Sequence, residues 1–275
     1  MTTRLAVLGS PIAHSQSPAL HTAAYGVLGL DWDYDAREVT GADLGTFVAG
    51  LDDTWRGLSL TMPLKKDILP LLDDVDPIAM LTGAVNTVVL SDGRRRGFNT
   101  DVYGITRAFR DAGVERLGSV WILGGGATAA SVLAAVHELG AREATLLVRS
   151  VARAGDITTL AATIGVRLTV SELGGPLPAA TPDAVVSTLP GHAEHDIRFS
   201  EAVRRESVLF DVAYSPWPST FAREWQAEGG SVISGLDMLI NQALAQVRIF
   251  VTGSAADALD DEPAVLAAMR AAVGS

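Results

Sequence analysis

The chain has 275 residues, of which 48% are hydrophobic and 19% are charged, so it is not disordered and is long enough for two domains. It has no cysteine, which excludes disulfides, thiol nucleophiles and cysteine-bound metals. With 21 basic and 32 acidic residues the net charge is −11, which disfavours binding to nucleic acid. No apolar run suits a membrane span or a signal peptide. We therefore expect a cytoplasmic enzyme that binds neither nucleic acid nor membranes.

The first hundred residues alternate between strand-like and helix-like segments. Their apolar patterns predict strands over residues 5–8, 34–39, 57–61 and 84–90. Helices are predicted over 43–51, over 67–72 and after Ser17, which is placed as the N-cap before Pro18. Asp92-Gly93 is a turn signal. The run Arg94–Arg96 that follows is expected to lie in the solvated turn rather than in a phosphate site.

From Val102 onward the rhythm becomes that of a parallel sheet with helical crossovers. Strands are predicted over residues 119–123, 144–148, 167–170, 184–187 and 208–211. Helices are predicted over 102–112, from the glycine-rich segment to 139, over 236–252 and over 263–273. Regular βαβ alternation indicates a doubly wound parallel sheet, so the fold class is α/β.

A glycine-rich segment, Gly124–Ala129, lies between a predicted strand and a predicted helix and fits the pattern G-x-G-x-x-A. Gly124 permits a tight turn, Gly126 lets the backbone approach a pyrophosphate, and Ala129 allows close helix packing. The helix N-terminus adds free N–H groups and a partial positive charge. The flanking strand and helix favour a dinucleotide site over an ordinary glycine-rich loop.

The end of the next strand bears on the choice of cofactor. A site for NAD places a carboxylate there, but this chain continues after Val148 with Arg149, Ser150 and Arg153. Guanidinium groups suit a 2′-phosphate, so NADP is the predicted cofactor. The alternative is that one or both arginines, Arg153 above all, are ordinary surface residues.

The use of lysine is unusual. The chain has 19 arginines but only two lysines, Lys65 and Lys66. Arginine stays protonated, whereas a lysine ammonium can give up its proton to a reacting group. A chain that otherwise uses arginine therefore points to a special role for one of the two lysines, although chance retention is the simple alternative for the other.

Several short motifs supply hydroxyl, amide, lysine and carboxylate groups suited to a small polyhydroxylated acid. They are Ile12–Pro18, Leu60–Lys65, Gly83–Thr87, Asn99–Asp101, Ser187–Gly191, Phe210–Pro216 and Gly235–Gln242. In this order and spacing the set resembles the shikimate dehydrogenase family, from Leu5 to Gln242 and the helix beyond. The resemblance implies NADPH-dependent reduction of 3-dehydroshikimate to shikimate in aromatic amino-acid biosynthesis.

The resemblance also implies two domains. Residues 1–101 and 237–275 would form an α/β substrate-binding domain completed by C-terminal helices. Residues 102–236 would form a Rossmann-type NADP-binding domain. The state of assembly is left open between monomer and homodimer, and no metal is implied.

Roles carry over from the family residue by residue. The substrate carboxylate would contact Ser15 and Ser17, with Tyr214 nearby, and the ring hydroxyls would contact Thr61, Asn86, Asp101 and Gln242. Lys65 would be the general acid/base, with Asp101 beside it. The implied NADP contacts are Gly124, Gly125, Gly126, Ala127, Thr128, Arg149, Ser150, Arg153, Val212 and Gly235.

Each assignment has a structural alternative. Ser17 could act only as a helix cap, Asn86 could anchor a turn, and Asp101 could cap the following helix. Tyr214 could be a core residue. For His14 and His21 a packing role is preferred to a catalytic one.

Three positions depart from the family pattern. They are Val102, Val148, where relatives commonly have Asn, and Asp237.

A quinate or dual quinate/shikimate dehydrogenase is the main rival function. Ser17 favours the shikimate branch of the family. The NAD-linked quinate branch is disfavoured because no carboxylate stands at the end of the strand that precedes Arg149. A non-catalytic NADP-binding regulatory protein would not need both Lys65 and Asp101.

Overall fold

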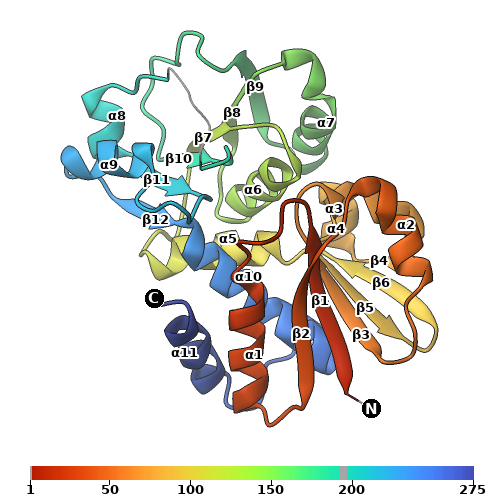
Figure 1. Cartoon of the computed structure of the whole chain (residues 1–275). Coiled ribbons are helices and arrows are strands. Elements are labelled where there is room, and N and C mark those ends of the chain that lie inside the picture. The colour runs from red at the N-terminus through yellow and green to blue at the C-terminus, as the bar shows by residue number, and fades with distance from the viewer. Residues whose placement is uncertain (1, 192–196) are drawn as a thin grey trace. The chain divides into compact units, whose positions relative to one another are not determined.

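The computed structural model describes residues 2–191 and 197–275, and the chain divides into two compact units. Unit 1 comprises Met1–Gly104 and Leu239–Ser275, and unit 2 comprises Ile105–Met238. The chain passes from one unit to the other inside helix α5 (Asp101–Asp111) and returns inside helix α10 (Gly235–Thr252). The red and dark-blue elements of Figure 1 thus belong to the same unit.

Unit 1 contains a mixed six-stranded sheet in the order β2-β1-β3-β5-β6-β4. Strand β1 pairs in parallel with β2 and β3, whereas β5 runs antiparallel to β3 and β6. The strands are β1 (Thr3–Gly9), β2 (Trp32–Glu38), β3 (Trp55–Leu60), β4 (Asp74–Val75), β5 (Thr87–Ser91) and β6 (Arg94–Phe98).

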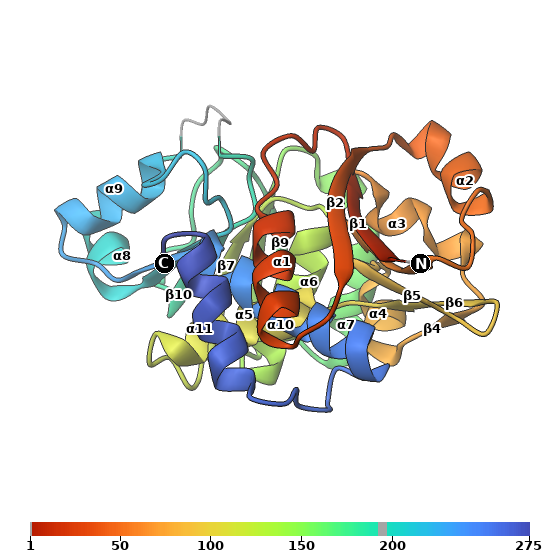
Figure 2. The same ribbon diagram turned by 60° about the horizontal axis from the view of Figure 1, so that its bottom comes forward.

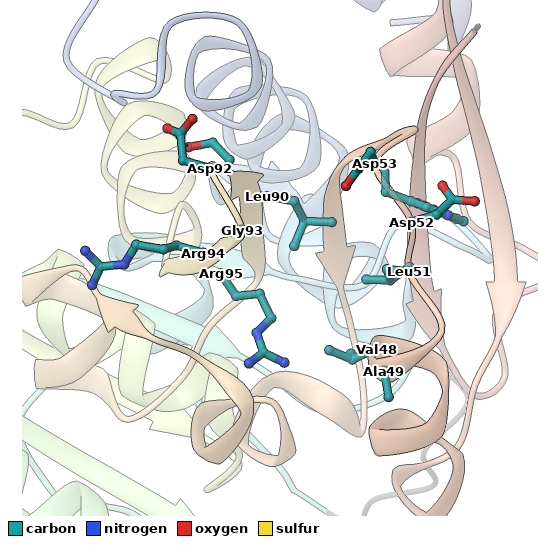
Figure 3. Close-up of a pocket in the computed structure, with 12 residues that line it drawn as sticks. Val48, Ala49, Leu51, Asp52, Asp53, Leu90, Asp92, Gly93, Arg94 and Arg95 are labelled. Carbon is teal, nitrogen blue, oxygen red and sulfur yellow. Dashed lines mark hydrogen bonds between the residues drawn. The ribbon is translucent and has the colours of Figure 1, made fainter.

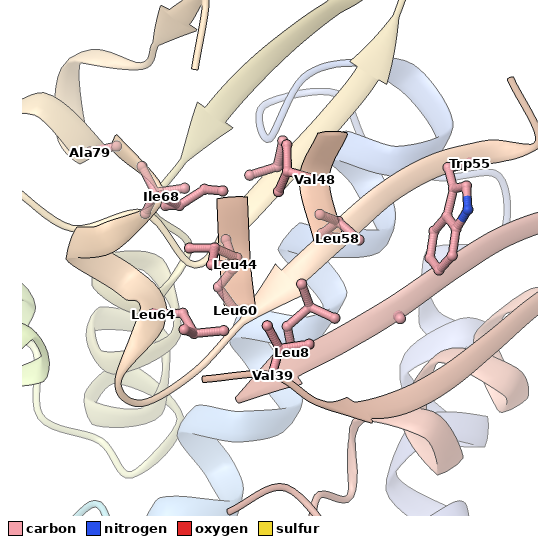
Figure 4. Packing of buried hydrophobic residues seen from close by; sticks show 13 residues of the cluster. Leu8, Val39, Leu44, Val48, Trp55, Leu58, Leu60, Leu64, Ile68 and Ala79 are labelled. Carbon is pink, nitrogen blue, oxygen red and sulfur yellow. The ribbon is translucent and has the colours of Figure 1, made fainter. Parts of the chain in front are cut away.

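The two faces of this sheet are chemically different. Side chains alternate along a strand, so Leu58 and Leu60 of β3 point to one face while Gly57 and Ser59 point to the other. On the first, which we call the leucine face, buried side chains from β1 and β3 pack with Leu44, Val48 and others from the covering helices (Figure 4). Those helices are α2 (Gly41–Ala49), α3 (Leu64–Asp67) and α4 (Pro77–Thr82).

The second face, which we call the polar face, is covered by α10 and by α1 (Ser17–Val27). Helix α10 approaches closely, because a Cβ on Gly57 would lie 2.5 Å from the Phe250 ring. Helix α11 (Glu262–Ala272) lies beside α1 in both views (Figures 1 and 2).

Unit 2 contains a fully parallel sheet in the order β12-β11-β10-β7-β8-β9. If the strands are numbered along the chain with β7 as strand 1, the order from β9 to β12 is 3-2-1-4-5-6. This is the strand order of a dinucleotide-binding fold. The strands are β7 (Ser119–Leu123), β8 (Glu143–Val148), β9 (Arg167–Glu172), β10 (Ala184–Ser187), β11 (Val208–Asp211) and β12 (Val232–Ser234). The helices between them are α6 (Ala127–Glu138), α7 (Gly155–Ile164), α8 (Glu201–Glu206) and α9 (Thr220–Ala227). The predicted α/β fold class is confirmed.

Several local predictions were wrong. The run Arg94–Arg96 is not a turn but the start of β6, where Arg95 and Arg96 form ion pairs with Asp73 and Asp74 beside and on strand β4. The helix expected over 67–72 is split into α3 and a 3₁₀ turn over Leu69–Leu71, because Pro70 cannot donate the hydrogen bond of a continuing α-helix. Helices α4, α7, α8 and α9 were not predicted.

The N-cap prediction for Ser17 was also wrong. Helix α1 begins at Ser17 itself, and the residue before it, Gln16, is the N-cap and makes no side-chain capping bond.

Across the described ranges, no helix combines the length and apolar character needed to cross a bilayer. Within the same ranges, no three acidic or histidine side chains gather as metal ligands would.

Candidate active site

The site in unit 1 is built around an ion pair between Lys65 and Asp101. Lys65 lies in α3, directly after β3, and its backbone oxygen accepts a hydrogen bond from the Val85 amide at 2.8 Å. The Nζ atom lies 2.5 Å from Oδ2 of Asp101, and the two side chains are 13% and 4% exposed. The neighbouring Lys66 side chain is exposed. The structure thus brings the one predicted acid/base to the predicted carboxylate.

Asp101 is the first residue of α5, but its carboxylate is not occupied in capping that helix. The amide of Asp101 donates to Oδ1 of Asn99 at 2.9 Å, so Asn99 supplies the side-chain acceptor at the helix start. The carboxylate is left to bind Lys65 through Oδ2 and Asn86 through Oδ1.

Asn86 and Gln242 join the same group of side chains. Asn86 Nδ2 lies 2.8 Å from Asp101 Oδ1, 2.9 Å from Thr100 Oγ1 and 3.3 Å from Gln242 Oε1. Asn86 Oδ1 accepts from the backbone amide of Thr100 at 2.9 Å. Four predicted residues from distant parts of the chain, Lys65, Asn86, Asp101 and Gln242, therefore form one hydrogen-bonded cluster. Thr100, the middle residue of the Asn99–Asp101 motif, belongs to the cluster too.

Thr61 follows β3 at the same end of the sheet. Its amide donates to the Leu8 oxygen at 2.9 Å, and its oxygen accepts from the Leu64 amide at 2.8 Å, which ties the turn to α3. A Cβ on Gly9 would lie 2.4 Å from Thr61 Cγ2, so only glycine at the end of β1 leaves room for this side chain. Thr61 is half-buried.

Ser15 and Ser17 lie at the start of α1. Ser15 is half-buried, and its hydroxyl accepts from the Ser17 amide at 3.3 Å. Ser17 is buried and its side chain lies near that of Tyr34, whose pKa burial raises. Tyr214 lies in unit 2, where partial burial raises its pKa, and its assignment to the substrate stays a prediction.

Of the two histidines for which a packing role was expected, His21 is packed in the interior and His14 is not. His21 is fully buried and stacks on Tyr34 with ring centres 4.0 Å apart. Burial lowers its pKa to about 3, so the ring is neutral at neutral pH. His14 is exposed.

The glycine-rich loop of unit 2 has the shape that a pyrophosphate requires. Gly124 has a φ of +99°, and a Cβ there would lie 2.4 Å from Thr188 Oγ1. Gly125 and Gly126 are exposed, and Gly126 is the residue that precedes α6. The backbone is therefore accessible at a helix N-terminus, as the binding of a dinucleotide phosphate needs.

The predicted ribose-phosphate contacts lie at the end of β8. Arg149, Ser150 and Arg153 are all exposed, and within residues 2–191 and 197–275 no ion pair involves either arginine. Val148 is buried, and a Cβ on Gly125 would lie 2.9 Å from its Cγ1. The departure at Val148 thus replaces an amide with an apolar contact beneath the glycine-rich loop.

Val212 and Gly235 approach each other closely within unit 2. A Cβ on Gly235 would lie 2.0 Å from the Val212 backbone oxygen, a distance that no side chain can accept. Glycine is therefore required where α10 begins. This contact holds together two of the segments that are predicted to meet NADP.

A pocket of about 480 Å³ lies at the opposite end of the unit 1 sheet (Figure 3). Its walls include Trp55, at the start of β3, and the turn between β5 and β6. Lys65 follows the end of β3 and Asn86 precedes the start of β5, so both lie at the opposite end of the sheet. Asp52 and Asp53 lie on one side and Arg94 and Arg95 on the other (Figure 3). None of the predicted site residues lines it.

Comparison with known proteins identifies the family. Residues 7–88 match the model of the shikimate dehydrogenase substrate binding domain. The shikimate dehydrogenase (NADP(+)) of Moorella thermoacetica is 33% identical over 270 residues, which cover 94% of this chain and 92% of that protein.

Solved structures agree. The Mycobacterium tuberculosis shikimate dehydrogenase has a TM-score of 0.84 and 35% identity, covering 98% of this chain and 99% of its own. The Thermus thermophilus shikimate 5-dehydrogenase, solved with NADP(H) and shikimate, has a TM-score of 0.82 and 32% identity, covering 98% of this chain and 100% of its own. Since relatives above 30% identity span more than nine-tenths of it, the chain belongs to the shikimate dehydrogenase family.

Proposed function

We propose that this protein is an NADP-dependent shikimate dehydrogenase that interconverts 3-dehydroshikimate and shikimate. The observation that carries the proposal is the Lys65–Asp101 pair, 2.5 Å apart and joined to Asn86, inside the family's substrate-binding unit. A relative solved with both NADP(H) and shikimate supports the same pair of ligands.

The substrate is a small acid with several hydroxyl groups, and unit 1 offers matching donors and acceptors. Ser15 and Ser17 would bind the carboxylate, and Tyr214 is a further predicted contact to it. Thr61, Asn86, Asp101 and Gln242 would bind the ring hydroxyls. A site that hydrogen-bonds each hydroxyl rejects analogues that lack one, because its own buried polar groups are then left unpaired.

Lys65 would perform the proton transfer. NADPH, when bound, supplies the hydride that reduces the ketone carbon. The Lys65 ammonium donates a proton from Nζ to the oxygen, which would otherwise become an alkoxide, and in the reverse direction Nζ takes that proton back. Oδ2 of Asp101 keeps the ammonium in place, and Oδ1 of the same carboxylate accepts a hydrogen bond from Asn86.

Unit 2 would bind the cofactor. The turn formed by Gly124, Gly125, Gly126, Ala127 and Thr128 would hold the pyrophosphate at the N-terminus of α6, and Val212 and Gly235 would also contact NADP. Arg149, Ser150 and Arg153 would hold the 2′-phosphate. Two exposed guanidinium groups without an ion pair in the described part of the chain support this choice of NADP over NAD.

The finer properties follow from composition. The absence of cysteine fits the reducing cytoplasm, and the net charge of −11 argues against nucleic acid as a partner. A monomer or a homodimer would serve, because Lys65, Asn86, Asp101 and Gln242 all come from one chain.

The test is an absorbance assay of the purified protein at the nicotinamide band. Shikimate and quinate are each offered with NADP and with NAD. We expect shikimate with NADP to react fastest. Faster reaction with quinate would favour the quinate branch of the family, and no reaction in any of the four mixtures would leave a cofactor-binding protein without catalysis.

A further inference from the structure

A layer of buried polar side chains lies on the polar face of the unit 1 sheet, beneath the proposed site. Its members come from α1, β2, β3, β5 and α10, and the proposed mechanism uses none of them. They are His21, Tyr25, Tyr34, Ser59, Thr87 and Gln246.

Gln246 is the junction of this layer and uses both ends of its amide. Its Nε2 donates to the backbone oxygen of Asn86 at 3.1 Å and to Thr87 Oγ1 at 3.0 Å. Its Oε1 accepts from Ser59 Oγ at 3.0 Å and faces His21 Nε2 at 3.1 Å. Because a backbone carbonyl only accepts hydrogen bonds, the amide has a single orientation that satisfies all four neighbours.

This orientation determines the tautomer of His21. Gln246 Oε1 can only accept, so Nε2 of His21 must carry the proton. A neutral imidazole has one N–H group, and the ring is neutral because burial lowers its pKa to about 3. Nδ1 therefore accepts from the Tyr25 hydroxyl, which lies 3.1 Å away.

The same logic passes from Gln246 to the active site. Thr87 Oγ1 accepts from Gln246, so it donates its own proton to Asn86 Oδ1 at 2.8 Å. That bond and the one from the Thr100 backbone amide, at 2.9 Å, hold the Asn86 oxygen away from Asp101 and direct Nδ2 to the Asp101 carboxylate. A reversed Asn86 amide would place its oxygen against a carboxylate oxygen, an arrangement with no proton between the two atoms.

We infer that Gln246 is a positioning residue for the reaction. Acting through Thr87 and through its own bond to the Asn86 backbone oxygen, it reinforces the amide orientation that the Thr100 amide also favours, and so helps to keep Asp101 in place to hold the Lys65 ammonium. A second branch leads from Gln246 through Ser59 and Tyr34 to Ser17, so one side chain braces two parts of the proposed substrate site. The inference rests on the proposed function for its kinetic consequence, but not for its structural one.

The first experiment compares Gln246→Met with Val247→Ala. Methionine keeps the length of glutamine but cannot make its hydrogen bonds, and Val247 is the equally buried neighbour on the same helix. We expect Gln246→Met to lower kcat about tenfold, the scale of one lost hydrogen bond to a charged group, with the KM for NADP unchanged. Val247→Ala should lower thermal stability but leave kcat within about twofold of the parent.

The second experiment reads Lys65 without any turnover. In a Lys66→Arg background, Lys65 is the only lysine in the chain, so mass spectrometry after brief acetylation at about pH 8 reports its reactivity. We expect acetylation of Lys65 to become several-fold faster in Gln246→Met, because the Lys65–Asp101 ion pair is weakened, and to stay unchanged in Val247→Ala. This measurement stays decisive even if shikimate proves to be the wrong substrate, an outcome that would first appear as an inactive parent protein.

The third experiment guards against misfolding of Gln246→Met and changes the next link instead. Thr87→Val removes the hydroxyl that donates to Asn86, whereas Thr87→Ser keeps it. We expect Thr87→Val to show the same loss of kcat and the same faster labelling of Lys65 as Gln246→Met. Thr87→Ser should keep both quantities at the parental values. Equal behaviour of the valine and serine variants, or parental kcat and labelling in Gln246→Met, would overturn the inference.

Discussion

Replacement of Lys65 by alanine tests the proposed chemistry most directly. The Nζ atom is the one amine placed against Asp101, and no other proton donor of comparable strength belongs to the described cluster around Asn86. A positioned acid/base contributes about 10²–10⁴ in rate, so turnover of shikimate should fall by that factor while the Kd for NADP changes little. Lys65→Arg should not restore activity, because a guanidinium does not readily release its proton.

Loss of stability must be separated from loss of chemistry. Lys65→Ala leaves the Asp101 carboxylate, whose side chain is 4% exposed, with Asn86 as its remaining side-chain donor. Breaking a buried pair in this way costs about 3–5 kcal/mol, and the Asn86 hydrogen bond keeps the cost near the lower end. The double variant Lys65→Ala/Asp101→Asn carries no buried charge and should recover most of the stability while staying inactive.

The assay is turnover of shikimate with NADP for Lys65→Ala, Lys66→Ala and the double variant, each alongside a thermal unfolding curve. Lys66→Ala is the matched control, because Lys66 is an exposed neighbour in the same short helix. Near-normal turnover of Lys65→Ala, or an equal collapse of both single variants, would remove Lys65 from the mechanism.

Three further predictions concern other parts of the molecule. Arg149→Ala should weaken NADP about ten- to a hundredfold and hardly affect NAD, and equal losses in titrations with the two cofactors would reject its phosphate contact. Burial lowers the pKa of His21 to about 3 in the fold, whereas the unfolded chain takes up this proton near pH 6.5. The free energy of unfolding should therefore fall as the pH drops from 6.5 toward 3, by about 2 kcal/mol at about pH 5. Denaturant unfolding should show this loss in the parent protein and not in His21→Gln. Gly235→Ala should destabilise the protein in thermal unfolding, since its Cβ would meet the Val212 oxygen at 2.0 Å, whereas Gly155→Ala, where nothing lies within 4 Å, should be tolerated.

Local sequence signals predicted unit 2 well where strand, loop and helix follow one another. The buried run 119–123, three glycines and an alanine-rich stretch became β7, the tight turn at Gly124 and α6. Each of these elements depends on neighbours in sequence, which is why pattern alone was sufficient. Helices such as α8 and α9 have only six and eight residues, too few to be stable alone, so their packing on the rest of the unit determines them more than their pattern does.

The arginine run shows where local signals fail. Three adjacent cations after a turn signal look like solvated loop, yet Arg95 and Arg96 lie in a strand between β5 and β4. Their charges are offset by Asp73 and Asp74, some twenty residues earlier in the chain. Strand pairing brought these partners together, and no periodicity in either segment predicts it.

In the candidate site, sequence motifs predicted the residues that would contact the substrate but not the buried side chains that support them. Lys65, Asn86 and Asp101 stand in short recognisable motifs, and the structure brings them together. Gln246 bonds Ser59 across 187 positions and His21 across 225, so its partners could not be named from the sequence. The one available signal was its spacing of four from Gln242, which places both amides on the same side of a helix.

The contrast between the two faces of β3 also specifies how this strand can pair. A slip of one residue against β1 or β5 would exchange the faces, bringing Leu58 and Leu60 onto Gln246 and His21 and burying Ser59 among the leucines. Every misaligned pairing of this kind would leave several donors and acceptors without partners in a water-free interior. A layer of hydrogen bonds that adds little to net stability therefore protects the chain against wrong alignments during folding, which a uniformly apolar sheet would tolerate.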